Sequence, residues 1–286
     1  MNGFATHEDK IYWPREKITK GEMLAYYNTV AKTLLRYTKD RPLVMHRFPN
    51  GIQGVSFYQK DVQKVPPFVK TVTIAHANRK VRYMIAQNAK TLLYAANLGS
   101  IEMHLFHSRI DHLEKPDYMI LDLDPLSVSF DAVIDTALVI HDFLDEHKIP
   151  NFCKTSGGTG LHIFVPLNAK YTYEESKFAA MTIAKITHKA LPKITSIERN
   201  PKKRERKVYI DTLQNAKSQL AVAPYSVRGF AGAPVSTPLD WSEVKHGLNP
   251  KAFTIENVPK RLAQKGDLFK KVLGKGGDLG VLLQGL

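Results

Sequence analysis

Cysteine is nearly missing from this sequence, because Cys153 is the only one among 286 residues. One thiol cannot form a disulfide within the chain, and it excludes a zinc site built from several cysteines. The sequence also lacks any run of about 18 uncharged apolar residues, and its first ten residues include His7, Glu8 and Asp9 where a signal segment would be apolar. We therefore expect a cytoplasmic protein that is neither secreted nor membrane-spanning.

Low-complexity tracts and internal repeats are absent as well. With 43% hydrophobic and 24% charged residues, nearly the whole chain is expected to fold. At this length a single large core approaches its upper size. We predict one domain over residues 1–286, with an N-terminal lobe over about 1–110 and a catalytic lobe over 111–286.

Positive charge is in clear excess, with a formal net charge of +14 and a pI near 9.6. The basic residues cluster at Lys10–Lys20, Lys60–Arg82 and Arg199–Lys207. A polyanionic partner, such as nucleic acid, is the natural inference. The alternative is that the lysines only keep the surface soluble.

Hydrophobic periodicity predicts alternating strands and helices. Capping boxes at Thr19/Glu22 and Thr172/Glu175 mark two helix starts. Further helices are expected over about 90–98 and from residue 130 to 144, and strands over 69–75, 80–85, 101–106, 118–123, 161–165, 208–211 and 220–225. The pattern predicts a mixed α/β (α+β) protein whose second half contains a mainly antiparallel sheet with flanking helices.

Two carboxylates, Asp122 and Asp124, lie two residues apart in the strand Tyr118–Pro125 and so point to the same face. Close carboxylates repel each other, and Mg²⁺ or Mn²⁺ with oxygen ligands relieves that repulsion. Asp211 ends another apolar strand and could complete a two-metal cluster for phosphoryl transfer. Alternatively, the pair faces solvent at a strand end or belongs to a sugar transferase, and Asp211 is a turn residue.

The segment Thr155–His162 combines hydroxyls, three glycines and a histidine entering a strand. Glycines such as Gly157 and Gly158 let backbone N–H groups approach phosphate oxygens, and Ser156 and His162 could hold the β- and γ-phosphates. The segment lacks the lysine of a Walker loop, and His162 alone would be typical of a core histidine.

Two other features suit nucleotides or nucleic acid. Arg228 could bind a triphosphate through its two-pronged guanidinium, although a surface salt bridge would use the same group. Phe57 and Tyr58 precede Gln59-Lys60, a pairing of stacking faces with positive charge that suits single-stranded template bases. Aromatics in an alternating strand are otherwise typical of a core.

Taken together, these motifs resemble the polymerase domain of bacterial ligase D, a branch of the archaeo-eukaryotic primase superfamily. The resemblance extends from His7 to Trp241, and the motifs that carry it stand in the same order: Leu121–Pro125, Ser156–His162, Asp211–Asn215 and Ala223–Arg228.

The resemblance implies a two-lobed primase-polymerase fold and a nucleotidyltransferase that works in non-homologous end joining or gap repair. It implies two Mn²⁺ or Mg²⁺ ions on Asp122, Asp124 and Asp211, with ribonucleoside triphosphates preferred. The incoming nucleotide would be bound by His104, Ser156, Gly157, Gly158, His162 and Arg228.

The resemblance also implies a set of DNA contacts. Lys10 and Lys20 match a pocket for a downstream 5′-phosphate, and Phe57 or Tyr58 matches the template-stacking aromatic. Arg47, Arg204 and Gln214 fall at other DNA-contacting positions. The sequence departs from the family pattern at His7, His46 and Thr159, where asparagine, lysine and lysine are common.

No Lys-x-Asp-Gly ligase motif and no histidine-rich phosphoesterase module is present. The expected partners are therefore gapped or broken DNA with a 5′-phosphate, nucleoside triphosphates, a separate DNA ligase and the Ku end-binding protein, and the expected location is the nucleoid. A fragment of a larger enzyme would show the same features. The competing hypotheses are a non-catalytic nucleic-acid end binder and a metal-dependent transferase acting on a nucleotide sugar, the second of which leaves the basic clusters unexplained.

Overall fold

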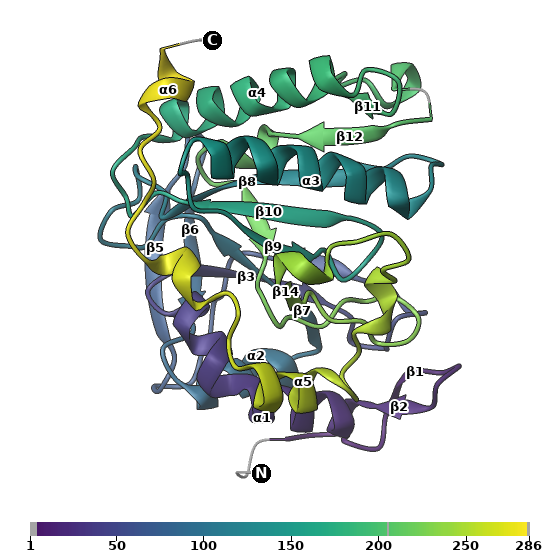
Figure 1. Cartoon of the computed structure of the whole chain (residues 1–286). Coiled ribbons are helices and arrows are strands. Elements are labelled where there is room, and N and C mark those ends of the chain that lie inside the picture. The colour runs from purple at the N-terminus through teal and green to yellow at the C-terminus, as the bar shows by residue number, and fades with distance from the viewer. Residues whose placement is uncertain (1–4, 205, 285–286) are drawn as a thin grey trace. The chain divides into compact units, whose positions relative to one another are not determined.

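A computed structural model describes residues 5–204 and 206–284. The chain forms two compact units, each with its own six-stranded sheet (Figure 1). Of the described residues, the first unit contains 5–111, 220–237 and 251–267, and the second contains 112–204, 206–219, 238–250 and 268–284. The sequence assigned all residues after about 110 to the catalytic lobe, whereas in the structure the chain returns twice to the first unit.

The sheet of the first unit has the order β13-β7-β3-β6-β5, with β4 paired to β3, and every pairing is antiparallel. Its strands are β3 (Pro42–Arg47), β4 (Phe57–Gln59), β5 (Lys70–Ala75), β6 (Lys80–Ile85), β7 (Ser100–Phe106) and β13 (Leu220–Val222). The strand predicted over 220–225 therefore ends at Val222 and joins β7 in this sheet. The central strand β7 is buried along its whole length.

The helices of the first unit are α1 (Lys20–Thr38), α2 (Ala89–Asn97) and α5 (Val258–Lys265), and a short hairpin of β1 (Ile11–Trp13) and β2 (Ile18–Thr19) precedes α1. The predicted capping box starts α1: the Glu22 backbone N–H donates to the Thr19 hydroxyl, and the Thr19 N–H donates to the Glu22 carboxylate. The apolar face of α1, including Met23, Tyr27 and Leu34, is buried.

The sheet of the second unit has the order β11-β12-β8-β10-β9-β14. Its strands are β8 (Tyr118–Pro125), β9 (Phe152–Thr155), β10 (Leu161–Pro166), β11 (Thr195–Ser196), β12 (Val208–Asp211) and β14 (Pro238–Leu239). Only the pair of β11 and β12 is parallel. The strand predicted over 118–123 is two residues longer in the structure, because Pro125 still pairs with Val208 as the last residue of β8.

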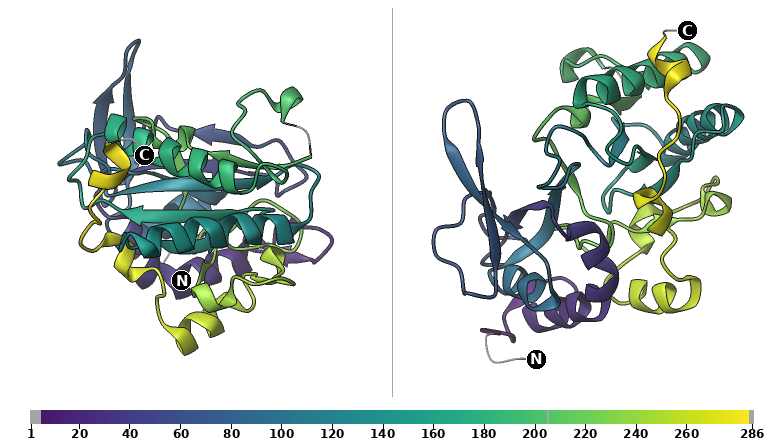
Figure 2. Two further views of the ribbon diagram at one scale, coloured as in Figure 1. Left: turned by 45° about the horizontal axis from the view of Figure 1, so that its top comes forward. Right: turned by 90° about the vertical axis from the view of Figure 1, so that its left-hand side faces the viewer.

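Two long helices, α3 (Phe130–Glu146) and α4 (Tyr173–Ala190), lie side by side and pack against β8 (Figures 1 and 2). The predicted Thr172/Glu175 capping box begins α4. The rest of this unit consists of 3₁₀ turns, including η1 (Pro201–Lys203), η2 (Leu213–Asn215) and η5 (Lys270–Leu273), and the short helix α6 (Gly280–Leu283). Across the described parts of both units, no helix is long and apolar enough to cross a membrane.

Candidate active site

One transverse row of polar side chains crosses four strands of the second unit. The antiparallel register pairs Lys154 of β9 with His162 of β10, His162 with Asp122 of β8, and Asp122 with Asp211 of β12. Residues in direct cross-strand register have side chains about 4.5–5.5 Å apart on the same face. The fold therefore brings together Asp122, Asp211 and His162.

Asp124 lies on the same face of β8 as Asp122, because the fully buried Leu121 and Leu123 point to the other face. Partial desolvation raises the pKa of the Asp124 carboxyl to about 6, and repulsion from Asp122 and then Asp211 adds to the increase. Burial likewise raises the pKa of Asp211, against a backbone N–H from Leu213 that donates to its Oδ1 at 2.7 Å. Negative charge is thus crowded at this end of the sheet.

His162 has a neighbour at each ring nitrogen. The Lys154 Nζ lies 2.9 Å from the His162 Nδ1. The His162 Nε2 lies 3.2 Å from the Asp122 Oδ1. Because Lys154 is fully buried, it contacts His162 from within the protein, and the imidazole is held between Lys154 and the carboxylates.

The glycine turn that precedes β10 is closed by Ser156. Its hydroxyl accepts hydrogen bonds from the backbone N–H groups of Gly158 and Gly160, both at 3.0 Å. A Cβ on Gly160 would lie 2.2 Å from the Leu123 carbonyl oxygen, so only glycine allows the turn to pass this close to β8. Gly157 has a φ of 72°, which also favours glycine.

Asp122, Asp124 and Asp211, which we call the carboxylate row, are suited to binding divalent cations that prefer oxygen ligands. Three carboxylates on one face, two of them with raised pKa values, are stabilised in their ionised form when positive charge is added. Carboxylate oxygens are the ligands that Mg²⁺ and Mn²⁺ prefer. Asp122, Asp124 and Asp211 are thus the residues that could hold such ions.

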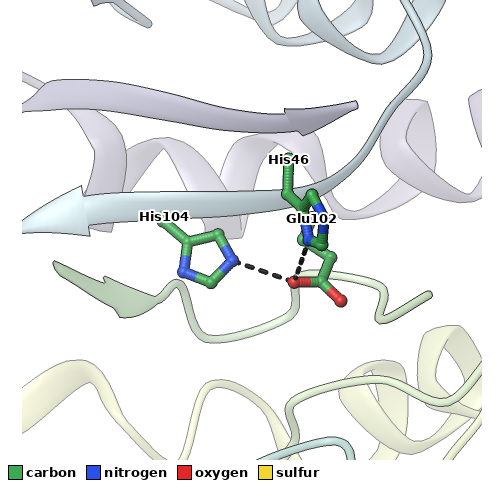
Figure 3. Close-up of side chains that lie close together, drawn as sticks. All are labelled: His46, Glu102 and His104. Carbon is green, nitrogen blue, oxygen red and sulfur yellow. Dashed lines mark hydrogen bonds and ion pairs between the residues drawn. The ribbon is translucent and has the colours of Figure 1, made fainter. Parts of the chain in front are cut away.

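A second cluster lies in the first unit, centred on Glu102 of β7. The Glu102 Oε2 accepts hydrogen bonds from the His104 Nε2 at 2.9 Å and from the His46 Nδ1 at 3.1 Å (Figure 3). Its Oε1 lies 3.1 Å from the Arg228 Nε and accepts from the Gly229 backbone N–H at 3.0 Å. The structure therefore brings together His104 and Arg228, two of the predicted nucleotide-binding residues.

The charge state of this cluster is well defined. Burial alone would raise the pKa of Glu102, but the hydrogen bonds from His104 and His46 and the charge of Arg228 hold it well below its usual range. Burial lowers the pKa of His104. Glu102 is thus ionised and His104 neutral near pH 7.

The predicted template-stacking aromatics are exposed at a cavity of about 460 Å³. Phe57 is 44% and Tyr58 54% exposed, which favours a binding role over a core role for both. The cavity is lined by Arg47, Phe57, Tyr58, Gln59, Lys60, Asp61 and Arg79. The Arg47 guanidinium lies over the Phe57 ring at 5.2 Å and donates to Gln59 at 2.8 Å.

Lys10 and Lys20, predicted to bind a 5′-phosphate, are neighbours in the first unit, since the Lys20 backbone N–H donates to the Lys10 carbonyl oxygen at 2.8 Å. The Lys10 side chain is exposed and donates to Asn50 and to the Pro49 carbonyl oxygen. Lys20 is buried and donates to the Thr6 carbonyl oxygen at 2.6 Å. Burial, followed by repulsion from Lys10, lowers the pKa of Lys20.

Arg204 and Gln214 flank β12 in the second unit. The Arg204 guanidinium lies 3.4 Å over the ring of Tyr209 and donates to two backbone carbonyl oxygens of the basic loop. Gln214 lies in η2, next to Asn215, whose amide exchanges two hydrogen bonds with the Ile120 backbone. The structure places both residues near the carboxylate row through β12 and β8.

Two members of these clusters were not singled out from the sequence. Lys154 lies within a short strand, and its importance depends on its register with His162. Glu102 stands two residues before His104, so the alternation of a strand places both on one face. That spacing is the signal that could have identified Glu102.

The mixed α/β fold and the three carboxylates on one face of a sheet are typical of a nucleotidyltransferase-type enzyme. The chain belongs to the LigD primase-polymerase domain family, because residues 19–269 match the family model described as "LigD, primase-polymerase domain". The resemblance predicted from the motifs and the predicted fold class are thereby confirmed.

Individual relatives agree with this family. The chain is 31% identical to the bifunctional non-homologous end joining protein LigD of Bacillus subtilis over 266 residues, 92% of this chain and 43% of the relative. It is 31% identical to the multifunctional LigD of Pseudomonas aeruginosa over 260 residues, 90% of this chain and 31% of the relative. The chain thus spans less than half the length of these curated relatives.

A solved structure has the same fold. The polymerase domain of Mycobacterium tuberculosis ligase D, determined in complex with DNA, superposes with a TM-score of 0.90 at 26% sequence identity. The match covers 96% of this chain and 99% of that domain. The primase-polymerase fold is therefore shared over nearly the whole chain.

Proposed function

We propose that this protein is a template-dependent polymerase that adds nucleotides, preferentially ribonucleotides, to a primer 3′ end at DNA gaps or double-strand breaks. In this reaction the 3′ oxygen attacks the α-phosphorus of a nucleoside triphosphate, and pyrophosphate leaves. The row of Asp211, Asp122 and His162, with Asp124 on the same face, is the observation that carries the proposal.

Each residue of the row has a task in this proposal. Asp122, Asp124 and Asp211 would hold two Mn²⁺ or Mg²⁺ ions, and these would supply activation of the 3′-hydroxyl and stabilisation of the triphosphate charge. His162, beside Asp122, would donate to a phosphate oxygen of the nucleotide. Ser156 keeps the glycine turn in shape, and His104 and Arg228 keep their predicted role in nucleotide binding.

The DNA contacts belong to the same proposal. The M. tuberculosis relative was solved with DNA, and this chain is strongly basic. Lys10 and Lys20 would bind the downstream 5′-phosphate, and Phe57 or Tyr58 would stack on a template base. A separate ligase and Ku are the proposed partners, because the relatives are named for non-homologous end joining.

The test is insertion of one nucleotide into a one-nucleotide gap, with and without the downstream 5′-phosphate, comparing ribo- with deoxynucleotides in Mn²⁺. We expect insertion that is stimulated by the phosphate and biased toward ribonucleotides. Asp211→Asn should lower the insertion rate by at least about 100-fold, because a metal ligand is lost. Asp142→Asn, which removes an exposed carboxylate from α3, is the matched control and should match wild type.

Three other outcomes would redirect the proposal. Insertion that ignores the 5′-phosphate would support a primase-like or general extension role. Equal rates with both sugars would remove the ribonucleotide preference alone. If wild type and Asp211→Asn both bind the gapped DNA but neither inserts a nucleotide, the protein is a non-catalytic end binder.

A further inference from the structure

The cluster around Glu102 has the composition of a metal site. His46 and Glu102 are direct cross-strand partners on β3 and β7, and His104 follows two residues after Glu102 on the same face. One ligand atom from each of the three residues lies within 4.8 Å of the others. Figure 3 shows both imidazole rings directed at one oxygen of the carboxylate.

The spacing of these atoms fits a shared ion. The Glu102 Oε2 lies 2.9 Å from the His104 Nε2 and 3.1 Å from the His46 Nδ1. With metal–ligand distances of about 2.1 Å, adjacent ligand atoms around one ion lie about 3.0–3.4 Å apart. Two of the three pairs of candidate ligand atoms therefore already have about this spacing, and an ion would replace the two hydrogen bonds.

The surroundings hold the ligands in place. The Glu102 Oε1 forms an ion pair with Arg228 and accepts a hydrogen bond from the Gly229 N–H. The His46 Nε2 lies 3.1 Å from the Ser56 hydroxyl. The His46 ring also stacks on Tyr58 at 4.1 Å between centroids. Such outer contacts orient the ligands in metal sites and fix the tautomers of the imidazoles.

The protonation states are also suitable. Ionised Glu102 is ready to bind a cation. The His104 Nε2 and the His46 Nδ1 both donate to Glu102 in the metal-free protein, so each imidazole binds an ion through that nitrogen only when its ring proton resides on the other nitrogen. In His46 that other nitrogen, Nε2, lies 3.1 Å from the Ser56 hydroxyl, which can accept the proton's hydrogen bond. The side chains of His46, His104 and Glu102 are 16%, 11% and 4% exposed, which leaves access for an ion from one side.

We propose that His46, Glu102 and His104 bind a divalent transition-metal ion, with Zn²⁺ as the best match. Two imidazole nitrogens and one carboxylate favour Zn²⁺ over Mg²⁺, in contrast to the oxygen-only row of aspartates. The nearby charge of Arg228 reduces the affinity for a cation but lies on the far oxygen of the carboxylate. The site lies outside the aspartate row, but it shares His104 with the proposed nucleotide-binding residues, so Zn²⁺ binding is measured directly and not through nucleotide insertion.

The experiment is equilibrium dialysis against Zn²⁺ with elemental analysis, on a full-length chain carrying Asp122→Asn, Asp124→Asn and Asp211→Asn. These changes remove the oxygen site. We expect one Zn²⁺ per chain, retained in excess Mg²⁺. Adding His46→Asn or His104→Gln keeps an N–H that can donate to Glu102 but removes a ligand, and should weaken binding by at least about 100-fold.

His246→Asn is the matched control, because it removes an exposed histidine that pairs only with a carboxylate on the surface, Asp135, at 2.6 Å. It should leave Zn²⁺ binding unchanged.

Co²⁺ substitution gives a second readout, as its absorption spectrum should change when His104 is replaced. If the triple variant does not fold, the same titrations are made on wild type with the aspartates saturated by Mg²⁺. No saturable Zn²⁺ binding, or equal binding in the His46 and His104 variants, would overturn the proposal and leave Glu102 as a hydrogen-bonding centre alone.

Discussion

Asp124 is held in a place where its ionised form is unfavourable. Its pKa of about 6 lies above the value of about 3.9 expected in an unfolded chain. A carboxyl with a raised folded-state pKa contributes stability that is fully present below the unfolded pKa and is lost as pH rises through the folded pKa. In the metal-free protein the contribution of Asp124 to stability should therefore be lost between about pH 4 and pH 6.

This sign gives a prediction for Asp124→Asn. Because asparagine carries no charge to repel Asp122, the variant should unfold on the order of 2 °C above wild type at pH 7.5 in EDTA, with little difference at pH 4. Thermal unfolding followed by circular dichroism measures both. With Mn²⁺ present, wild type should unfold at a higher temperature than Asp124→Asn, because the ion stabilises the intact set of carboxylates more. Asp142→Asn removes an exposed charge from α3 and should show no such pH dependence; if it behaves like Asp124→Asn, repulsion within the row is not the cause.

At the scale of elements, the turn before β10 depends on a close approach to β8. A Cβ on Gly160 would meet the Leu123 carbonyl oxygen at 2.2 Å and the Asp124 Oδ1 at 3.5 Å. Gly160→Ala should therefore push the turn away from β8, lower the unfolding temperature by several degrees and reduce nucleotide insertion by at least about 10-fold. Thr159→Ala, in the exposed position of the same turn, should do neither. If Gly160→Ala and Thr159→Ala lose stability and nucleotide insertion equally, the close approach of Gly160 to β8 is not the cause.

The sequence predicted the helix starts and the shared face of β8 well, because the residues that determine these features lie within a few positions of one another. Both capping boxes start helices where expected, and the alternation in β8 places Asp122 and Asp124 on one face. The partners of these residues could not be predicted in the same way. Lys154 meets His162 only through the register of β9 and β10, and strand register depends on contacts between distant segments.

At the scale of the whole molecule, the division into two units was predicted only in part. A boundary near residue 111 follows from the order of elements, but the return of 220–237 and 251–267 to the first unit does not. Leu220–Val222 is an ordinary short apolar strand that could pair with either sheet. Its place beside β7 is decided by tertiary packing, which no local pattern records.

The net charge of +14 leads to a prediction about DNA binding. Each phosphate neutralised by a basic side chain adds about 0.9 to the slope of log affinity against log salt. Exposed Lys202 and Lys203 lie in the loop before β12, at the end of the sheet that carries Asp122 and Asp124. Lys202→Gln with Lys203→Gln should therefore lower the slope for gapped DNA by up to about 2, measured by fluorescence anisotropy between about 50 and 200 mM KCl.

The control removes the same charge from the same unit. Lys148 and Lys170 are exposed and lie at the other end of the sheet, before β9 and after β10. If DNA binds at the end of the sheet that carries Asp122 and Asp124, Lys148→Gln with Lys170→Gln should leave the slope unchanged, although this variant loses as much net charge as the Lys202 and Lys203 variant. Equal reductions of the slope in both double variants would mean that DNA affinity depends on the overall charge of the protein. A lysine that contacts a phosphate releases counterions only at that contact, so a local interface predicts a reduced slope for Lys202 and Lys203 alone.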